Sequence, residues 1–107
     1  MNDSLVIKNV KTDLWNELVK RSAIDGWRIV HEYDNFDKGI DHDFLILAKG
    51  DEMMFFAWDN WFEGEVRCSA ARQQELEQQF NLQFKVGDPL YLKSDVIKRK
   101  LDELKKA

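Results

Sequence analysis

The sequence predicts an α+β fold, a four-stranded antiparallel meander sheet packed with three helices in the order α-β-β-β-β-α-α. Three observations predict it. Two runs in the middle of the chain are apolar on both faces, as strands at the centre of a sheet are. The runs on either side of them alternate between apolar and polar residues, as half-exposed strands do. Three further segments carry apolar residues at helical spacing.

The first helix is expected over residues 11–25. Thr12 can cap its first turn, and Gly26 is a natural left-handed terminator. Its apolar residues follow the i, i+3, i+4 spacing of one helix face and are Leu14, Trp15, Leu18 and Val19. Ahead of this helix, residues 5–8 read only weakly as extended chain, so they are not counted in the sheet.

Four strands are expected next, over residues 27–33, 43–49, 53–58 and 65–69. The second and third are joined by a turn short enough for a tight hairpin. This order places the two doubly apolar strands at the centre of the sheet and the two alternating strands at its edges. In the first strand the residues that share a face are Trp27, Ile29, His31 and Tyr33.

Two helices complete the predicted fold. One covers residues 70–80, with Ser69 as its cap and Leu76 facing the core. The other begins after Ser94, and its apolar stripe consists of Ile97, Leu101 and Leu104. Between the two helices the apolar residues alternate, and a short extra strand near 82–86 is a further option.

Composition indicates one folded α+β domain over residues 1–107. Apolar residues make up 44% of the chain and charged residues 34%, which is typical of folded domains. No apolar stretch approaches the ~20 residues of a membrane span, and the N-terminus lacks the pattern of a signal peptide. We therefore expect a cytoplasmic protein without a membrane partner. Cys68 is the single cysteine, which excludes an intrachain disulfide and a multi-cysteine zinc site.

Charge is unevenly distributed along the chain. Residues 31–66 carry ten acidic and two basic side chains, whereas the segments before and after them are mildly basic. An acidic middle would repel the phosphate backbone of DNA or RNA. We therefore expect no nucleic-acid partner.

The acidic stretch 34–43 suggests a metal site, because its carboxylates offer hard oxygen ligands and its imidazole offers one nitrogen ligand. Its candidate ligands are Asp34, Asp37, Asp41, His42 and Asp43. The stretch does not fit a calcium-binding EF-hand loop, since Phe36 occupies the third position from its first aspartate. We interpret it as a solvated hairpin loop and expect no metal and no cofactor.

No catalytic site is expected either. A nucleophile and base could be drawn from Cys68 with His31 or His42, but Cys68 is predicted on the inward face of its strand, as a packed thiol. His31 is predicted on an apolar face, as a hydrogen-bonded core residue. Glu63 and Glu65 alternate onto one side of the fourth strand, where we expect them to be exposed and solvated.

The aromatic run at residues 55–62 is the most informative feature for function, since five of its eight residues are aromatic. Its first part fits a buried strand. Trp61 and Phe62 follow a predicted turn, where large aromatic side chains are costly to leave bare, and tryptophan is enriched at the energetic centres of interfaces. The predicted partner-binding residues are Trp58, Asp59, Trp61, Phe62, Glu63 and Glu65.

Two functions from different classes are compatible with these features. The first is a protein-binding or inhibitory module of the immunity type, which engages a basic protein partner through its acidic, aromatic surface without catalysis. The alternative is a homodimeric α+β domain that binds a small ligand in an apolar cup between sheet and helices. Besides a protein partner, we expect self-association to a homodimer through a partly uncovered sheet face.

Overall fold

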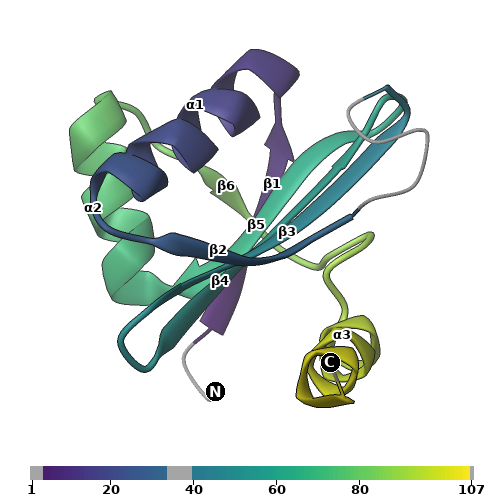
Figure 1. Cartoon of the computed structure of the whole chain (residues 1–107). Coiled ribbons are helices and arrows are strands. Elements are labelled where there is room, and N and C mark those ends of the chain that lie inside the picture. The colour runs from purple at the N-terminus through teal and green to yellow at the C-terminus, as the bar shows by residue number, and fades with distance from the viewer. Residues whose placement is uncertain (1–3, 34–39, 107) are drawn as a thin grey trace.

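The computed structural model describes residues 4–33 and 40–106 and has an α+β fold (Figure 1). Six antiparallel strands form one sheet in the order β2-β3-β4-β5-β1-β6. The elements follow the chain as β1 (Ser4–Val10), α1 (Thr12–Ile24), β2 (Arg28–Glu32), β3 (His42–Lys49), β4 (Glu52–Asp59), β5 (Glu63–Ser69), α2 (Ala70–Phe80), β6 (Lys85–Val86) and α3 (Ser94–Lys106). None of the helices in these described ranges is long and apolar enough to cross a membrane.

The predicted meander is present as β2 to β5, but the sheet is larger than the sequence indicated. β1 pairs with β5, and the two-residue β6 pairs with β1. The meander therefore ends inside the sheet: β5, expected to be an edge strand, has a hydrogen-bonded neighbour on each side.

Helices α1 and α2 cover one face of the sheet, as Figure 1 shows. The predicted stripe of α1 faces this core, where Trp15 and Leu18 are buried. Ser69 caps α2 as predicted, since its hydroxyl accepts a hydrogen bond of 3.1 Å from the backbone N–H of Arg72. The predicted cap of α1 is wrong. Thr12 makes no capping hydrogen bond, and its hydroxyl instead accepts a hydrogen bond from the Trp58 indole at 2.9 Å.

Helix α3 covers the opposite face of the sheet (Figure 1). The side chains buried between it and the sheet are Phe44, Ile46, Phe55, Ala57, Leu92 and Ile97. The alternate residues of β3 and β4 pack under α1 and α2. Both central strands are therefore covered on both faces, which confirms the interpretation of their double-sided apolarity.

The expectation of one common apolar face for β2 is wrong, because a bulge interrupts the strand. Ile29 pairs with Leu47 on the α1 side, whereas His31 pairs with Ile46 on the α3 side, and the register shifts between them. An extra residue in one strand turns the residues after it to the other face. His31 consequently packs edge-to-face against Phe44, with ring centroids 6.0 Å apart.

Candidate functional site

The aromatic pair predicted to bind a partner lies at the tip of the β4–β5 hairpin. Residues 60–62 form the turn, and Asp59 pairs with Glu63 as the last rung of the ladder. The Asp59 carboxylate accepts a hydrogen bond of 2.8 Å from the backbone N–H of Trp61, and Glu63 adopts a left-handed conformation with φ of 69°. The backbone of the turn is thus held at both ends, while Trp61 is 67% exposed and Phe62 62% exposed.

Further acidic and apolar groups around this turn come from the two residues just before β3. The backbone N–H of Asn60 donates a hydrogen bond of 3.0 Å to the carbonyl of Asp41, so the two segments lie side by side. Ile40, next along the chain, is 64% exposed. We call the resulting patch the tip surface; it consists of the exposed Ile40, Trp61 and Phe62 and the half-buried Asp41, Asp59 and Glu63.

Two residues predicted for the partner-binding surface lie elsewhere. Trp58 is only 6% exposed and belongs to the core under α1. Glu65, expected to be exposed and solvated, is only 3% exposed. Its carboxylate faces α3 and accepts hydrogen bonds from the backbone N–H groups of Leu90, Tyr91 and Leu92 at 2.6, 3.0 and 3.0 Å. Sequence reasoning placed Glu65 on a solvated face of its strand, whereas residues 90–92, just before α3, cover that face.

Negative charge at the tip surface affects the neighbouring Tyr91. Burial raises the pKa of the Tyr91 phenol above its usual 10.0, and the nearby carboxylates of Asp59 and Glu65 raise it further. A hydrogen bond with Asp59 acts in the same direction. The Asp59 carboxylate is therefore shared between the turn backbone and this tyrosine, and it is a fixed part of the tip surface.

The thiol and the imidazoles do not form a nucleophile and base. Cys68 is buried on the α1 side of the sheet, and burial raises the pKa of its thiol to about 12. His31 packs against Phe44 on the other side. His42 lies opposite Asp59 in the ladder between β3 and β4. Its ring packs edge-to-face against Tyr33, with ring centroids 4.8 Å apart. The burial of Cys68 confirms its interpretation as a packed thiol. Because only the thiolate is a nucleophile, the raised pKa also keeps this thiol unreactive at neutral pH.

The predicted solvated loop over residues 34–43 lies mostly outside the residues that the structure describes, including Asp34 and Asp37. Within the described ranges, no group of three or more histidine, cysteine, aspartate or glutamate side chains could hold a metal ion.

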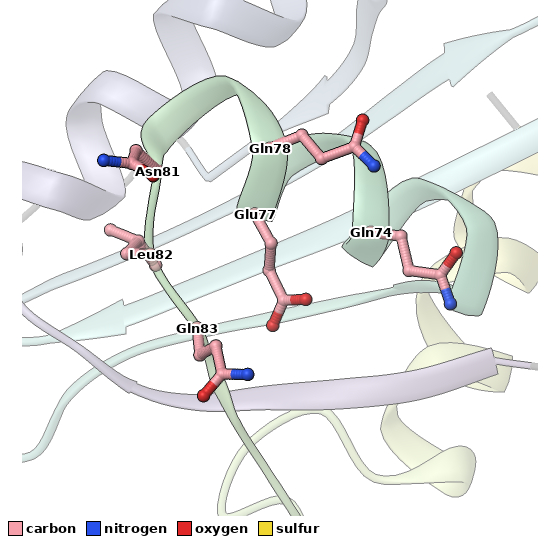
Figure 2. A pocket seen from close by; sticks show the side chains of 6 residues that line it. All are labelled: Gln74, Glu77, Gln78, Asn81, Leu82 and Gln83. Carbon is pink, nitrogen blue, oxygen red and sulfur yellow. The ribbon is translucent and has the colours of Figure 1, made fainter.

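A polar hollow of about 450 Å³ lies at the C-terminal end of α2, but its side chains are used by the fold. Figure 2 shows that the six lining side chains are spread along the helix and the following loop and do not converge on one point. The Glu77 carboxylate accepts hydrogen bonds from the Phe84 backbone at 2.9 Å and from Gln73 at 3.0 Å. Glu77 therefore closes the connection from α2 to β6.

A smaller hollow of about 240 Å³ surrounds Arg72, which is 6% exposed. The guanidinium lies 5.3 Å from the centre of the Trp27 ring and forms ion pairs with Asp25, at 3.5 Å, and with Glu75. The ion pair with Asp25 ties α2 to the end of α1. Arg72 therefore has a structural role. The sequence did not indicate it, because Arg72 stands among the polar residues of α2.

Sequence reasoning missed two features of the tip surface, the exposure of Ile40 and the proximity of Asp41 to the turn. A lone isoleucine inside an acidic stretch was the available signal for the first.

Comparisons with protein-family models, with curated proteins and with solved structures found no match. The assignment of a function therefore rests on the geometry of the molecule itself.

Proposed function

We propose that this protein is a binding module of the inhibitory type, which engages a basic protein partner through the tip surface. The observation that carries the proposal is the exposure of two adjacent aromatic side chains, Trp61 and Phe62, on a turn whose backbone is fixed. Among the described residues, the other large aromatic side chains are buried in two cores or packed partly buried against them, so this pair is an exception.

Burial of the pair against a partner would supply substantial binding energy. A buried aromatic side chain removes about 150–250 Å² from water, at roughly 25 cal/mol per Å². With about two-thirds of each side chain still exposed, covering one of them contributes roughly 2–4 kcal/mol. The hydrogen bond from Trp61 to Asp59 holds the turn in place, so little conformational entropy is lost on binding.

Charge favours a basic partner over a second copy of this chain. Asp41, Asp59 and Glu63 surround the aromatic pair. In a symmetric dimer through the tip surface, the acids of one copy would face the same acids of the other, and like charges oppose association. A cationic partner would meet complementary charge and would associate faster at low salt.

The proposal is tested by capture from a lysate of the native host with three immobilised baits. The wild type is compared with a Trp61→Ser, Phe62→Ser double variant and with Ile24→Ser, which removes an apolar side chain of 76% exposure at the end of α1. We expect a basic protein to be retained by the wild type and by Ile24→Ser, and lost by the double variant. Equal retention by all three baits would contradict the proposal.

Light scattering on the purified wild type and double variant tests whether the tip surface instead joins two copies of this chain. If the tip surface joins two copies, the wild type is a dimer and the double variant a monomer. The proposal predicts that both proteins have the same mass at micromolar concentration.

A further inference from the structure

A groove of about 570 Å³ lies between α3 and the face of the sheet that α3 covers. Its volume is in the range of small-molecule sites, about 300–1,000 Å³. The apolar part of its lining comes from β4 and α3 and consists of Met53, Phe55, Ile97 and Leu101. Met53 and Leu101 are only partly buried, so the helix leaves an apolar strip of its own core open along one side.

Arg67 of β5 lies in the same lining as a half-buried cation. Its Nε donates a hydrogen bond of 3.2 Å to the Ser4 hydroxyl, and Nη1 donates one of 2.9 Å to the carbonyl of Leu92. These two bonds fix the plane of the guanidinium. Nη2 makes no hydrogen bond to any residue that the structure describes, and none of those residues places a carboxylate in an ion pair with Arg67.

The acid nearest along the strand cannot neutralise Arg67 without breaking other bonds. Glu65 lies on the same face of β5, but its carboxylate already accepts three backbone hydrogen bonds from residues 90–92. A guanidinium held in one orientation beside apolar surface, with a donor to spare, is suited to an anionic group.

The charged side chains that line the groove leave an excess of positive charge. Lys98 and Lys105 of α3 are exposed there, opposite Asp102 of the same helix and Asp51 of the β3–β4 turn. With Arg67 included, three cations stand against two anions. An anionic group is therefore favoured over a cationic one at this position.

We propose that this groove binds an amphiphile with one apolar chain and a carboxylate headgroup. The carboxylate accepts a hydrogen bond from Nη2 of Arg67, with Lys98 adding charge at the mouth. The apolar chain lies along Met53, Phe55 and Leu101. The proposal is independent of the tip surface, which lies at the hairpin joining β4 to β5, whereas this groove reaches the opposite turn at Asp51.

The first test is a titration of the wild-type protein with decanoate, followed by backbone amide NMR. We expect saturable one-to-one binding, with the largest shifts at Met53, Arg67 and Leu101. Decanol shares the chain but lacks the charge, and decyltrimethylammonium reverses the charge. Decanoate should bind at least about tenfold more tightly than either. Equal affinity for all three, no saturable binding of decanoate, or shifts centred on Trp61 would overturn the proposal.

Two pairs of variants on α3 complete the test. Leu101→Trp fills the groove and should abolish decanoate binding, whereas Leu104→Trp changes a residue of the same stripe that does not line the groove. Lys98→Glu should weaken binding about three- to tenfold. Arg99→Glu makes the same charge change on an exposed residue outside the lining and should have less than about a twofold effect. Circular dichroism checks that the variants fold. If the two variants within each pair bind decanoate with the same affinity, the site is wrongly assigned.

Discussion

The carboxylate of Glu65 accepts a hydrogen bond of 3.0 Å from the backbone N–H of Leu92, 27 positions further along the chain. The carbonyl of Leu92 accepts a hydrogen bond of 2.9 Å from Arg67, two residues after Glu65 on β5. One strand therefore satisfies both backbone groups of a fully buried residue. Since Leu92 lies just before α3, this pair of contacts holds the entry to the helix on the sheet.

Replacing Glu65 with glutamine tests this connection. The substitution removes the charge that three N–H groups share and presents an amide donor to some of them. We expect the free energy of unfolding to fall by about 2–4 kcal/mol, because hydrogen bonds to charged groups are worth about 1.5–3 kcal/mol each and part of the loss is recovered by the remaining oxygen. Urea unfolding measures it. Glu63→Gln on the same strand should cost less than about 0.5 kcal/mol, and an equal loss in both variants would contradict this account.

Gly64→Ala should destabilise the protein by packing alone. A Cβ atom on Gly64 would lie 2.3 Å from Cδ1 of Trp15, a buried side chain that cannot move aside. Overpacking of this kind costs about 1–3 kcal/mol. Gly87→Ala is the matched control, since its added Cβ meets only the flexible side chain of Lys8, at 3.2 Å. Thermal unfolding should show a lower melting temperature for Gly64→Ala and little change for Gly87→Ala.

The buried thiol of Cys68 predicts a loss of stability at alkaline pH. Burial raises the pKa of this thiol from 9.0 to about 12, so the folded state holds the proton more tightly than the unfolded chain does. The resulting stabilisation is complete below pH 9 and is lost as the pH rises from 9 towards 12. Between pH 8 and pH 10.5, the stability advantage of the wild type over Cys68→Ala should fall by about 2 kcal/mol.

Val66→Ala provides the control for that comparison, because it also removes buried atoms from β5 but carries no titratable group. Its deficit relative to the wild type should be the same at both pH values in urea unfolding. A Cys68→Ala deficit that is equally independent of pH would show that the thiol does not titrate with folding.

The tip surface should contribute little to folding. Trp61 and Phe62 are mostly exposed, and the turn is held by backbone contacts that neither side chain makes. We expect the Trp61→Ser, Phe62→Ser double variant to unfold within about 1 kcal/mol of the wild type in urea. A loss of several kcal/mol would show that the pair is part of the core.

Local signals predicted the helices well. Ser69 caps α2, and the apolar stripe of α3 faces the sheet, because each depends on residues within a few positions of one another. The central hairpin was also predictable, since its turn and its two apolar strands are contiguous in sequence. What these signals could not give is the neighbour of β5. β1 and β5 pair although they lie far apart in the sequence, so no local signal joins them. The strand β1 is also irregular, since its register shifts between Ile7 and Val10 and Asn9 has a left-handed conformation.

The segment before α3 explains the error at Glu65 and the overlooked role of Arg67. Alternation placed Glu65 on one side of β5, a side that Arg67 shares. Whether that side meets water or protein depends on a contact with residues 90–92. The bulge in β2 misled the prediction for His31 in the same way, since one extra residue reverses a strand's faces without any mark in composition. In the candidate site, Trp61 and Phe62 were identifiable because two large aromatics beside a turn have no local reason to be buried.

The proposed role of Trp61 and Phe62 is to anchor a basic protein partner within an acidic surface. The most direct measurement is the dissociation constant of the captured partner for the wild type and for the Trp61→Ser, Phe62→Ser double variant, at 50 and 500 mM salt. We predict a loss of affinity of at least about a hundredfold in the double variant and a marked weakening of wild-type binding at high salt. Equal affinities for the two proteins, or binding that is insensitive to salt, would contradict the account.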